Sequence, residues 1–279
     1  MAAPVALIAG NGRLPVELAT ALTEQPGGVR VFALEGEAGT ELAPFDPVAV
    51  SFTTLGRLFG AMKAEGCERV IMAGGVVNRP ELASMVRADW GTLTSLAGVL
   101  GNLFAGDSTL LTSVIDVIAS RGFTVVGVAD VAPQLLALEG AVAGPPAGKR
   151  SQRQIREGVR VARTMGELDV GQGCVVVGSR AVAIEGAEGT DAMLERVEHL
   201  RSIGRLPSRR GGVLVKWPKP QQDLRVDLPA IGPETVRNAH LAGLDGIGIA
   251  AGRTVVLDRQ RLGEQAAALR ISVHAVAGA

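Results

Sequence analysis

Short apolar runs alternate with segments of helical spacing between residues 5 and 128 of this 279-residue chain. The apolar runs lie at 5–9, 29–34, 69–73 and 123–128, and the helical spacing at 55–65 and 109–120. Short apolar runs bounded by turn signals are typical of buried strands, and glycine or a capping residue stands at the turns into the helices. This alternation predicts a parallel sheet covered by helices, here an N-terminal Rossmann-like α/β domain.

The second half of the chain contains the same kinds of segment in a less regular order. Helical spacing is found at 152–165, 191–201, 233–241 and 259–269, and strand signals at 174–178, 181–185, 212–216, 246–250, 254–257 and 271–276. The runs on either side of Ser179-Arg180 form an apparent hairpin, which predicts antiparallel pairing. We therefore expect a C-terminal mixed α/β domain.

A stretch rich in glycine and proline separates the two halves. Its residues are Gly140, Gly144, Pro145, Pro146 and Gly148, a composition typical of linkers. We predict an N-terminal α/β domain at 1–133, a linker at 134–150 and a C-terminal α/β domain at 151–279.

Composition excludes several classes of partner. The 28 basic and 28 acidic residues leave no net formal charge, and with no tyrosine and 3% aromatic residues the chain has little to stack on bases. We therefore expect no nucleic-acid partner. Cys67 and Cys174 show no CxxC spacing and lie beside apolar runs, which indicates buried, reduced thiols. The sequence shows no signal peptide and no apolar run of roughly 18 residues, so we expect a cytoplasmic protein.

The segment 214–229 concentrates charged side chains in a stretch that three prolines keep out of helix. Lys216, Lys219 and Arg225 can hold phosphate oxygens, and acids such as Asp227 can hold a metal ion or a water molecule. Cations beside acids are typical of a phosphoryl-transfer site. Because prolines and charges are also common in surface loops, a purely structural loop is the alternative.

Gly10-Asn11-Gly12 forms a glycine-rich turn between the first strand and a helix that we expect to open at Pro15. Such a turn lets backbone N–H groups and the helix N-terminus approach a phosphate. A dinucleotide fingerprint would need glycine or alanine at Pro15, so the turn favours a phosphate or nucleotide contact over NAD binding.

Polar residues also begin two later helices. Asp107 stands before the apolar helix at 109–120, and Thr190-Asp191 before the helix that contains Met193 and Leu194. Helix capping explains both positions without chemistry. The N–H groups of a helix N-terminus also bind anions, so capping and substrate binding are compatible.

These segments, in this order, resemble the LpxI-type UDP-2,3-diacylglucosamine pyrophosphatases of lipid A biosynthesis. The most specific strings are Glu188-Gly189-Thr190-Asp191-Ala192-Met193-Leu194 and Arg225-Val226-Asp227-Leu228-Pro229-Ala230-Ile231-Gly232. The other matching segments are 7–15, 74–80, Gly106-Asp107, 168–172 and the rest of 218–232. Together they cover most of the chain.

The resemblance implies a Mg²⁺-dependent hydrolase with two domains joined by a linker. Its substrate would be the lipid-linked sugar nucleotide UDP-2,3-diacylglucosamine, bound between the domains and cleaved at the diphosphate. The products would be UMP and 2,3-diacylglucosamine 1-phosphate (lipid X). A lipid substrate also implies peripheral contact with the inner membrane. The sequence leaves the oligomeric state open, a homo-oligomer included.

For this function we expect Asp227 to be the leading catalytic acid, which binds Mg²⁺ or positions the attacking water. Asp191 would be the second acid and metal ligand, and Lys216 a catalytic cation. The expected substrate-binding residues are Gly10, Asn11, Gly12, Asp107, Thr190, Lys219, Gln222 and Arg225.

The chain departs from the family pattern at one position. Relatives usually carry two consecutive acids after the glycine equivalent to Gly106, whereas here Ser108 follows Asp107. If the second acid supports catalysis, a carrier or sensor of the UDP-sugar lipid that does not turn it over becomes the main alternative. An NAD(P)-dependent oxidoreductase is a further alternative, against which Pro15 stands.

Overall fold

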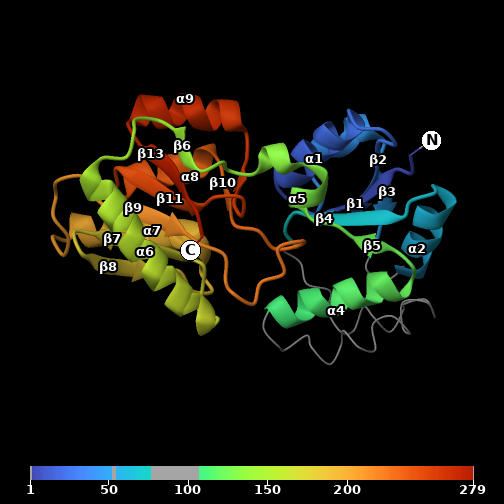
Figure 1. Ribbon diagram of the computed structural model, residues 1–279, viewed down its shortest axis with the longest axis horizontal. Coiled ribbons are helices and arrows are strands. Elements are labelled where there is room, and N and C mark those ends of the chain that lie inside the picture. Colours follow the sequence, from blue (N-terminus) through green and yellow to red (C-terminus); the bar gives the residue numbers. More distant parts are fainter. Residues whose placement is uncertain (1, 52–54, 77–106, 279) are drawn as a thin grey trace. The chain divides into compact units, whose positions relative to one another are not determined.

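The computed structural model describes residues 2–51, 55–76 and 107–278, which form two compact α/β units (Figure 1). The first unit comprises Met1–Pro133 and, from much later in the sequence, Asp223–Asp227. The second comprises Gln134–Gln222 and Leu228–Ala279. The predicted fold class, two α/β domains, is confirmed.

The first unit is built on a five-stranded parallel sheet in the order β3-β2-β1-β4-β5. Its strands are β1 (Val5–Ala9), β2 (Val29–Leu34), β3 (Val48–Val50), β4 (Arg69–Ala73) and β5 (Thr124–Val125). The helices are α1 (Leu14–Thr23), α2 (Leu55–Ala64), α4 (Asp107–Ser120), α5 (Val128–Val131) and the 3₁₀ helix η1 (Thr40–Phe45). Because β2 and β4 flank β1 on opposite sides, the strand order reverses there. Ligands of open α/β sheets bind at the carboxyl ends of strands at such a reversal.

The second unit is built on a six-stranded mixed sheet in the order β6-β13-β11-β9-β7-β8. Strand β11 pairs in parallel with β9 and β13, whereas β7 is antiparallel to β8 and β9, and β6 to β13. The strands are β6 (Gly140–Ala143), β7 (Gly173–Val177), β8 (Arg180–Ile184), β9 (Val213–Lys216), β11 (Gly246–Ala250) and β13 (Ser272–Val276). Two short strands, β10 (Ala230–Ile231) and β12 (Val255–Val256), pair in parallel beside it.

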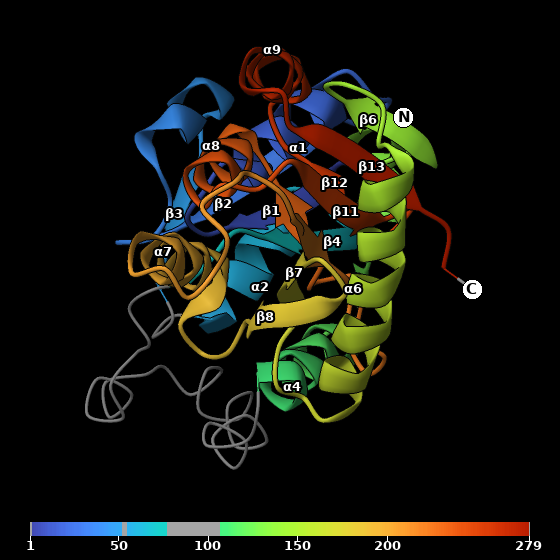
Figure 2. The same cartoon turned by 90° about the vertical axis from the view of Figure 1, so that its left-hand side faces the viewer.

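Helices cover both faces of this sheet, as Figure 2 shows. They are α6 (Lys149–Glu167) on one face, and α7 (Gly189–Ser202), α8 (Pro233–Leu241) and α9 (Arg259–Leu269) on the other. The short helical turn η4 (Pro133–Leu135) precedes this unit's first strand.

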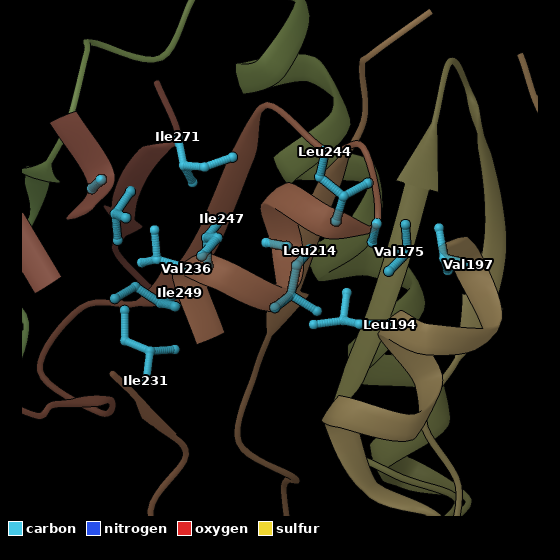
Figure 3. Packing of buried hydrophobic residues seen from close by; sticks show 14 of the residues in the cluster. Val175, Leu194, Val197, Leu214, Ile231, Val236, Leu244, Ile247, Ile249 and Ile271 are labelled. Carbon is cyan, nitrogen blue, oxygen red and sulfur yellow. The ribbon is translucent and has the colours of Figure 1, made fainter. Parts of the chain in front are cut away.

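Two hydrophobic cores lie on the two faces of this sheet. The larger, which we call the α7–α8 core, contains Val175, Leu194, Leu214 and Val236 (Figure 3). The other, the α6 core, contains residues such as Ile155, Ala162, Val213, Val215 and Trp217. Alternate residues of β9 therefore face different cores, as the period of a strand requires.

The stretch predicted as a linker, 134–150, contains a strand of the second sheet. Gly140–Ala143 forms β6 and pairs with β13, and α6 already begins at Lys149. The glycines and prolines of 144–148 connect these two elements. An edge strand this short takes its hydrogen bonds from a partner more than 120 residues later, so local composition did not reveal it. Within the described residues, no helix has the length and hydropathy needed to span a membrane.

Candidate active site

Two glycine-containing turns, at residues 10–12 and 74–75, are joined by backbone hydrogen bonds at the carboxyl edge of the first sheet. The N–H of Gly10 donates to Ala73 O (2.8 Å), and the N–H of Asn11 donates to Gly75 O (2.8 Å). A Cβ atom on Gly10 would collide with the carbonyl oxygen of Gly75, so the close approach requires glycine. Because carbonyl oxygens of Ala73 in β4 and of Gly75 just after it accept from these two N–H groups, the predicted nucleotide contact would fall to exposed groups, the Asn11 side chain and Gly12. That contact stays a prediction.

The segment Asp223–Asp227 belongs to the first unit, where it lies beside Gly127, two residues after the end of β5. A Cβ atom on Gly127 would be 2.9 Å from the Cα of Arg225, and Val226 packs against the hydrophobic core of that unit. The carbonyl oxygen of Asp223 accepts hydrogen bonds from the N–H groups of Val226 (3.1 Å) and Asp227 (3.0 Å). The half-buried Asp227 is thus held at the end of a hydrogen-bonded turn near the carboxyl edge of the sheet.

Arg225 forms an ion pair within this turn. Its Nη2 lies 2.6 Å from Asp223 Oδ2 and its Nε 3.0 Å from Oδ1, while its backbone N–H also donates to Oδ1. These hydrogen bonds lower the pKa of Asp223 below its ordinary value, although burial acts in the opposite direction. The guanidinium that was predicted to clamp phosphate therefore already has a carboxylate partner, which a substrate phosphate would have to replace.

In the second unit, three residues form one row across adjacent strands. Gly173 of β7 is directly opposite Lys216 of β9, and the N–H of Glu185 donates to Gly173 O (2.8 Å) on the other side. Lys216 follows Leu214 by two residues, so it faces the α7–α8 core; its relative exposure is only 9%. The Nζ of Lys216 donates to the carbonyl oxygen of Ala230 (3.1 Å). A buried cation, Lys216, therefore lies at the end of β9 on this face of the sheet.

Glu185 faces the same core, because Ala183 of that core precedes it by two residues. Its carboxylate occupies the space that a side chain at position 173 would fill, so a larger residue there would displace the carboxylate. Oε1 accepts a hydrogen bond from the hydroxyl of Thr190 (2.7 Å), the second residue of α7. Lys216, Glu185 and Thr190 are therefore grouped at one end of the sheet. The prediction included the lysine and the threonine but missed Glu185.

Asp191 follows Thr190 in the first turn of α7 and is exposed. Its Oδ1 accepts a hydrogen bond from the side-chain amide of Asn238 on α8 (2.9 Å). A carboxylate at this helix end is stabilised by the helix dipole. Asp191 and Asp227 belong to different units, so the shared metal ion expected for them stays a prediction.

Lys219 and Gln222 form a second polar group in this unit, against the end of α6. Lys219 Nζ pairs with Asp169 Oδ1 (2.7 Å), and the Gln222 side-chain oxygen accepts a hydrogen bond from the Lys219 N–H (2.9 Å). A Cβ atom on Gly166 of α6 would be 3.2 Å from the Cα of Lys219. Both residues hold the proline-rich loop in shape, and the phosphate contact predicted for them stays a prediction.

Some predicted positions lie outside the described residues. Residues 77–80 of the segment 74–80 are among them, as is Gly106. Asp107 begins α4, but the structure does not describe its side chain. Its predicted role in substrate binding stays a prediction.

The oxygen donors of the second unit suit Mg²⁺. Among the described residues, no three His, Cys, Asp or Glu side chains come together in a cluster. Mg²⁺ does not need one, since it is usually bound by one or two carboxylates together with water and substrate phosphates. Glu185 offers a buried carboxylate oxygen, Oε2, that no other described group of this unit hydrogen-bonds. The carboxylates of Glu185 and Asp191 are thus chemically suited to hold the ion.

Fold and site together define a class, that of two-domain α/β enzymes that act on phosphorylated, anionic substrates. The chain belongs to the LpxI family. The family model described as the LpxI N-terminal domain matches residues 4–135, and the LpxI C-terminal domain matches residues 138–274. The resemblance seen in the sequence is thereby confirmed.

The similarity to one relative gives the same result. The chain is 38% identical over 255 residues to the UDP-2,3-diacylglucosamine pyrophosphatase LpxI of Caulobacter vibrioides. The match covers 91% of this chain and 90% of the relative.

Proposed function

We propose that this protein hydrolyses the diphosphate of UDP-2,3-diacylglucosamine to UMP and 2,3-diacylglucosamine 1-phosphate in lipid A biosynthesis, with Mg²⁺ as cofactor. The family and the name of its relative support the substrate. The structural observation that supports the chemistry is the buried ammonium of Lys216, grouped with Glu185 and Thr190 where β9 ends and α7 begins. A buried cation beside a helix N-terminus is suited to hold phosphate oxygens.

A diphosphate resists hydrolysis because its negative oxygens repel an incoming water molecule. Bound Mg²⁺ would neutralise part of that charge. The chain itself supplies Lys216, whose ammonium stabilises negative charge on the phosphate oxygens without a large solvent reorganisation, since it is already buried. Asp227 positions the attacking water. One phosphorus–oxygen bond forms with that water, which loses its proton to the solvent. The bridging bond breaks, and each product leaves as a phosphate monoester.

Exposed apolar side chains near this group suit the lipid part of the substrate. Val170 and Ile184 are each about 43% exposed. They immediately precede Gly171 and Glu185, whose backbones are in close contact. Leu168, at 72% exposure, lies two residues before Val170. Each acyl CH₂ that these side chains remove from water would contribute about 0.8 kcal/mol. We therefore also propose peripheral contact with the cytoplasmic face of the inner membrane; self-association stays a prediction.

The direct test is release of UMP from UDP-2,3-diacylglucosamine by the purified protein, with Mg²⁺ and with EDTA. We expect turnover that Mg²⁺ supports and EDTA abolishes. Turnover that persists in EDTA would contradict the Mg²⁺ dependence alone. Tight binding of the substrate without any release of UMP at saturating Mg²⁺ would contradict the hydrolase and support the carrier, which Ser108 makes the main alternative.

A further inference from the structure

We propose that Glu185 is a ligand of the bound divalent cation, with Oε2 as the coordinating atom. The proposal rests on the proposed function, because it assumes that the enzyme holds such an ion at the diphosphate. It adds an acid of the second unit that the motifs of the sequence did not single out.

The first argument is the state of the Glu185 carboxylate. The residue is 6% exposed, and Oε2 is fully buried with no hydrogen-bond partner among the described residues. Leaving a buried carboxylate oxygen without a partner costs free energy that a folded protein normally avoids. The other oxygen, Oε1, is held by the hydroxyl of Thr190 at 2.7 Å. The side chain is therefore fixed in one orientation, with one oxygen still available.

The second argument is how closely the backbone is fitted to this carboxylate. A Cβ atom on Gly173 would collide with Oε2, and one on Gly171 would collide with the carbonyl oxygen of Glu185. Neither glycine has a positive φ. Gly171 is therefore needed for space rather than for backbone conformation, and a side chain at position 173 would have to displace the Glu185 carboxylate.

The third argument is charge. Glu185 and Lys216 flank Gly173 in the same row of the sheet and face the same side. The Glu185 carboxylate lies over Gly173, which is directly opposite Lys216 in the neighbouring strand. A carboxylate in a site for a diphosphate would repel the substrate unless a cation lay between them. A divalent ion held by Glu185 would supply that cation.

The test is a titration of the full-length protein with Mn²⁺ in the presence of UMP, followed by electron paramagnetic resonance of the free ion. Mn²⁺ prefers the same oxygen ligands as Mg²⁺. We expect Glu185→Gln to weaken Mn²⁺ binding at least tenfold, because the amide loses the charge but keeps the size and an acceptor for Thr190. Glu185→Asp should restore part of the affinity, since it restores the carboxylate.

The matched control is Glu188→Gln. Glu188 lies three residues further along the same loop but is paired with Arg196 (2.9 Å) at the surface, so its neutralisation should leave Mn²⁺ binding unchanged. The Mg²⁺ concentration that gives half-maximal turnover should rise in Glu185→Gln and stay constant in Glu188→Gln. A change that was merely structural would lower the maximal rate without this shift.

Two results would overturn the proposal: Mn²⁺ binding by Glu185→Gln as tight as in the wild type, or equal weakening in Glu185→Gln and Glu188→Gln. The proposed function is judged separately by the turnover of the wild type. If the wild type releases UMP and Glu185→Gln binds Mn²⁺ normally, only the role of Glu185 falls. If the wild type releases no UMP, the proposed function falls, and the Mn²⁺ titration still decides whether Glu185 binds the ion.

Discussion

Gly127 and Arg225 are in backbone contact, although 97 residues separate them in the sequence. A Cβ atom on Gly127 would be 2.9 Å from the Cα of Arg225 and 3.4 Å from the carbonyl oxygen of Leu224. Gly127 has a φ of −103°, which any residue can adopt. The glycine is thus required for the docking of the segment Asp223–Asp227 and not for its own backbone conformation.

We expect Gly127→Ala to lower kcat by about 10- to 100-fold with a smaller change in KM, because displacing this segment moves Asp227 away from its working position. The measurement is steady-state release of UMP. Gly60→Ala in α2 is the control, since nothing lies within 4 Å of the added methyl group there. It should keep full activity. A fully active Gly127→Ala enzyme would show that the segment can move without consequence.

Asp227→Ala is expected to lower kcat by about 10³-fold, equivalent to about 4 kcal/mol of transition-state stabilisation. Substrate affinity should change little, since an acid that acts on the attacking water contributes mainly to the transition state. Single-turnover kinetics and a separate binding titration distinguish the two effects. Near-normal kcat with a raised KM would make Asp227 a binding residue instead.

Lys216→Met should abolish most turnover without lowering the melting temperature. The buried ammonium is costly to desolvate, and an unbranched apolar side chain of similar length fills the same space. We expect kcat/KM to fall at least 100-fold and thermal unfolding to occur at the same or a higher temperature. If the melting temperature fell steeply while the residual activity remained high, the lysine would be structural.

Gly158→Ala should destabilise the second unit. An added methyl group would collide with the Cγ2 atom of Val215 in the α6 core, where α6 lies on the sheet. Overpacking of this kind typically costs about 1–3 kcal/mol, which exceeds the gain of up to about 1 kcal/mol from replacing a helical glycine by alanine. Urea unfolding measures the difference. Gly263→Ala in α9, with open space around it, should instead be neutral or stabilising.

Because of Cys174, the free energy of unfolding should decrease as the pH rises above 9. Burial raises the pKa of its thiol from 9.0 to about 12, and its Sγ lies 3.4 Å from the carbonyl oxygen of Gly158. The unfolded chain releases this proton near pH 9 but the folded chain does not. The thiol's contribution is therefore complete below pH 9 and is lost as the pH rises toward 12. The free energy of unfolding, measured with urea, should fall more steeply with rising pH in the wild type than in Cys174→Val. Equal slopes would contradict this.

Much of the fold could be predicted from the sequence, because strand and helix periodicity is local information. The apolar runs that predicted β1, β2, β4, β7, β9 and β11 correspond to strands within a residue or two of their bounds. Strands β3, β6 and β10 were not predicted. β3 is only three residues long, and the glycine-containing β6 owes its pairing to β13 rather than to its own composition.

The candidate site could be predicted only in part, for two different reasons. Lys216 lies two residues after Leu214, a residue of the α7–α8 core, so strand alternation predicts that it is buried on the same face. Glu185 lies two residues after Ala183 of the same core, so the same alternation could have indicated Glu185. The docking of Val226 against the first unit's core depends on tertiary contacts that no local pattern contains. The pairing of Arg225 with Asp223, two residues before it, could have been expected from their spacing.

The family models divide the chain between residues 135 and 138, yet the structure assigns Asp223–Asp227 to the unit formed by the first 133 residues. The gene segment for one domain therefore encodes the acid that the other domain holds in place. A chimaera that joined the N-terminal half of one relative to the C-terminal half of another would separate Gly127 from the Leu224-Arg225 it has to fit. Natural recombination at this boundary would meet the same obstacle, so the two halves are expected to be inherited together.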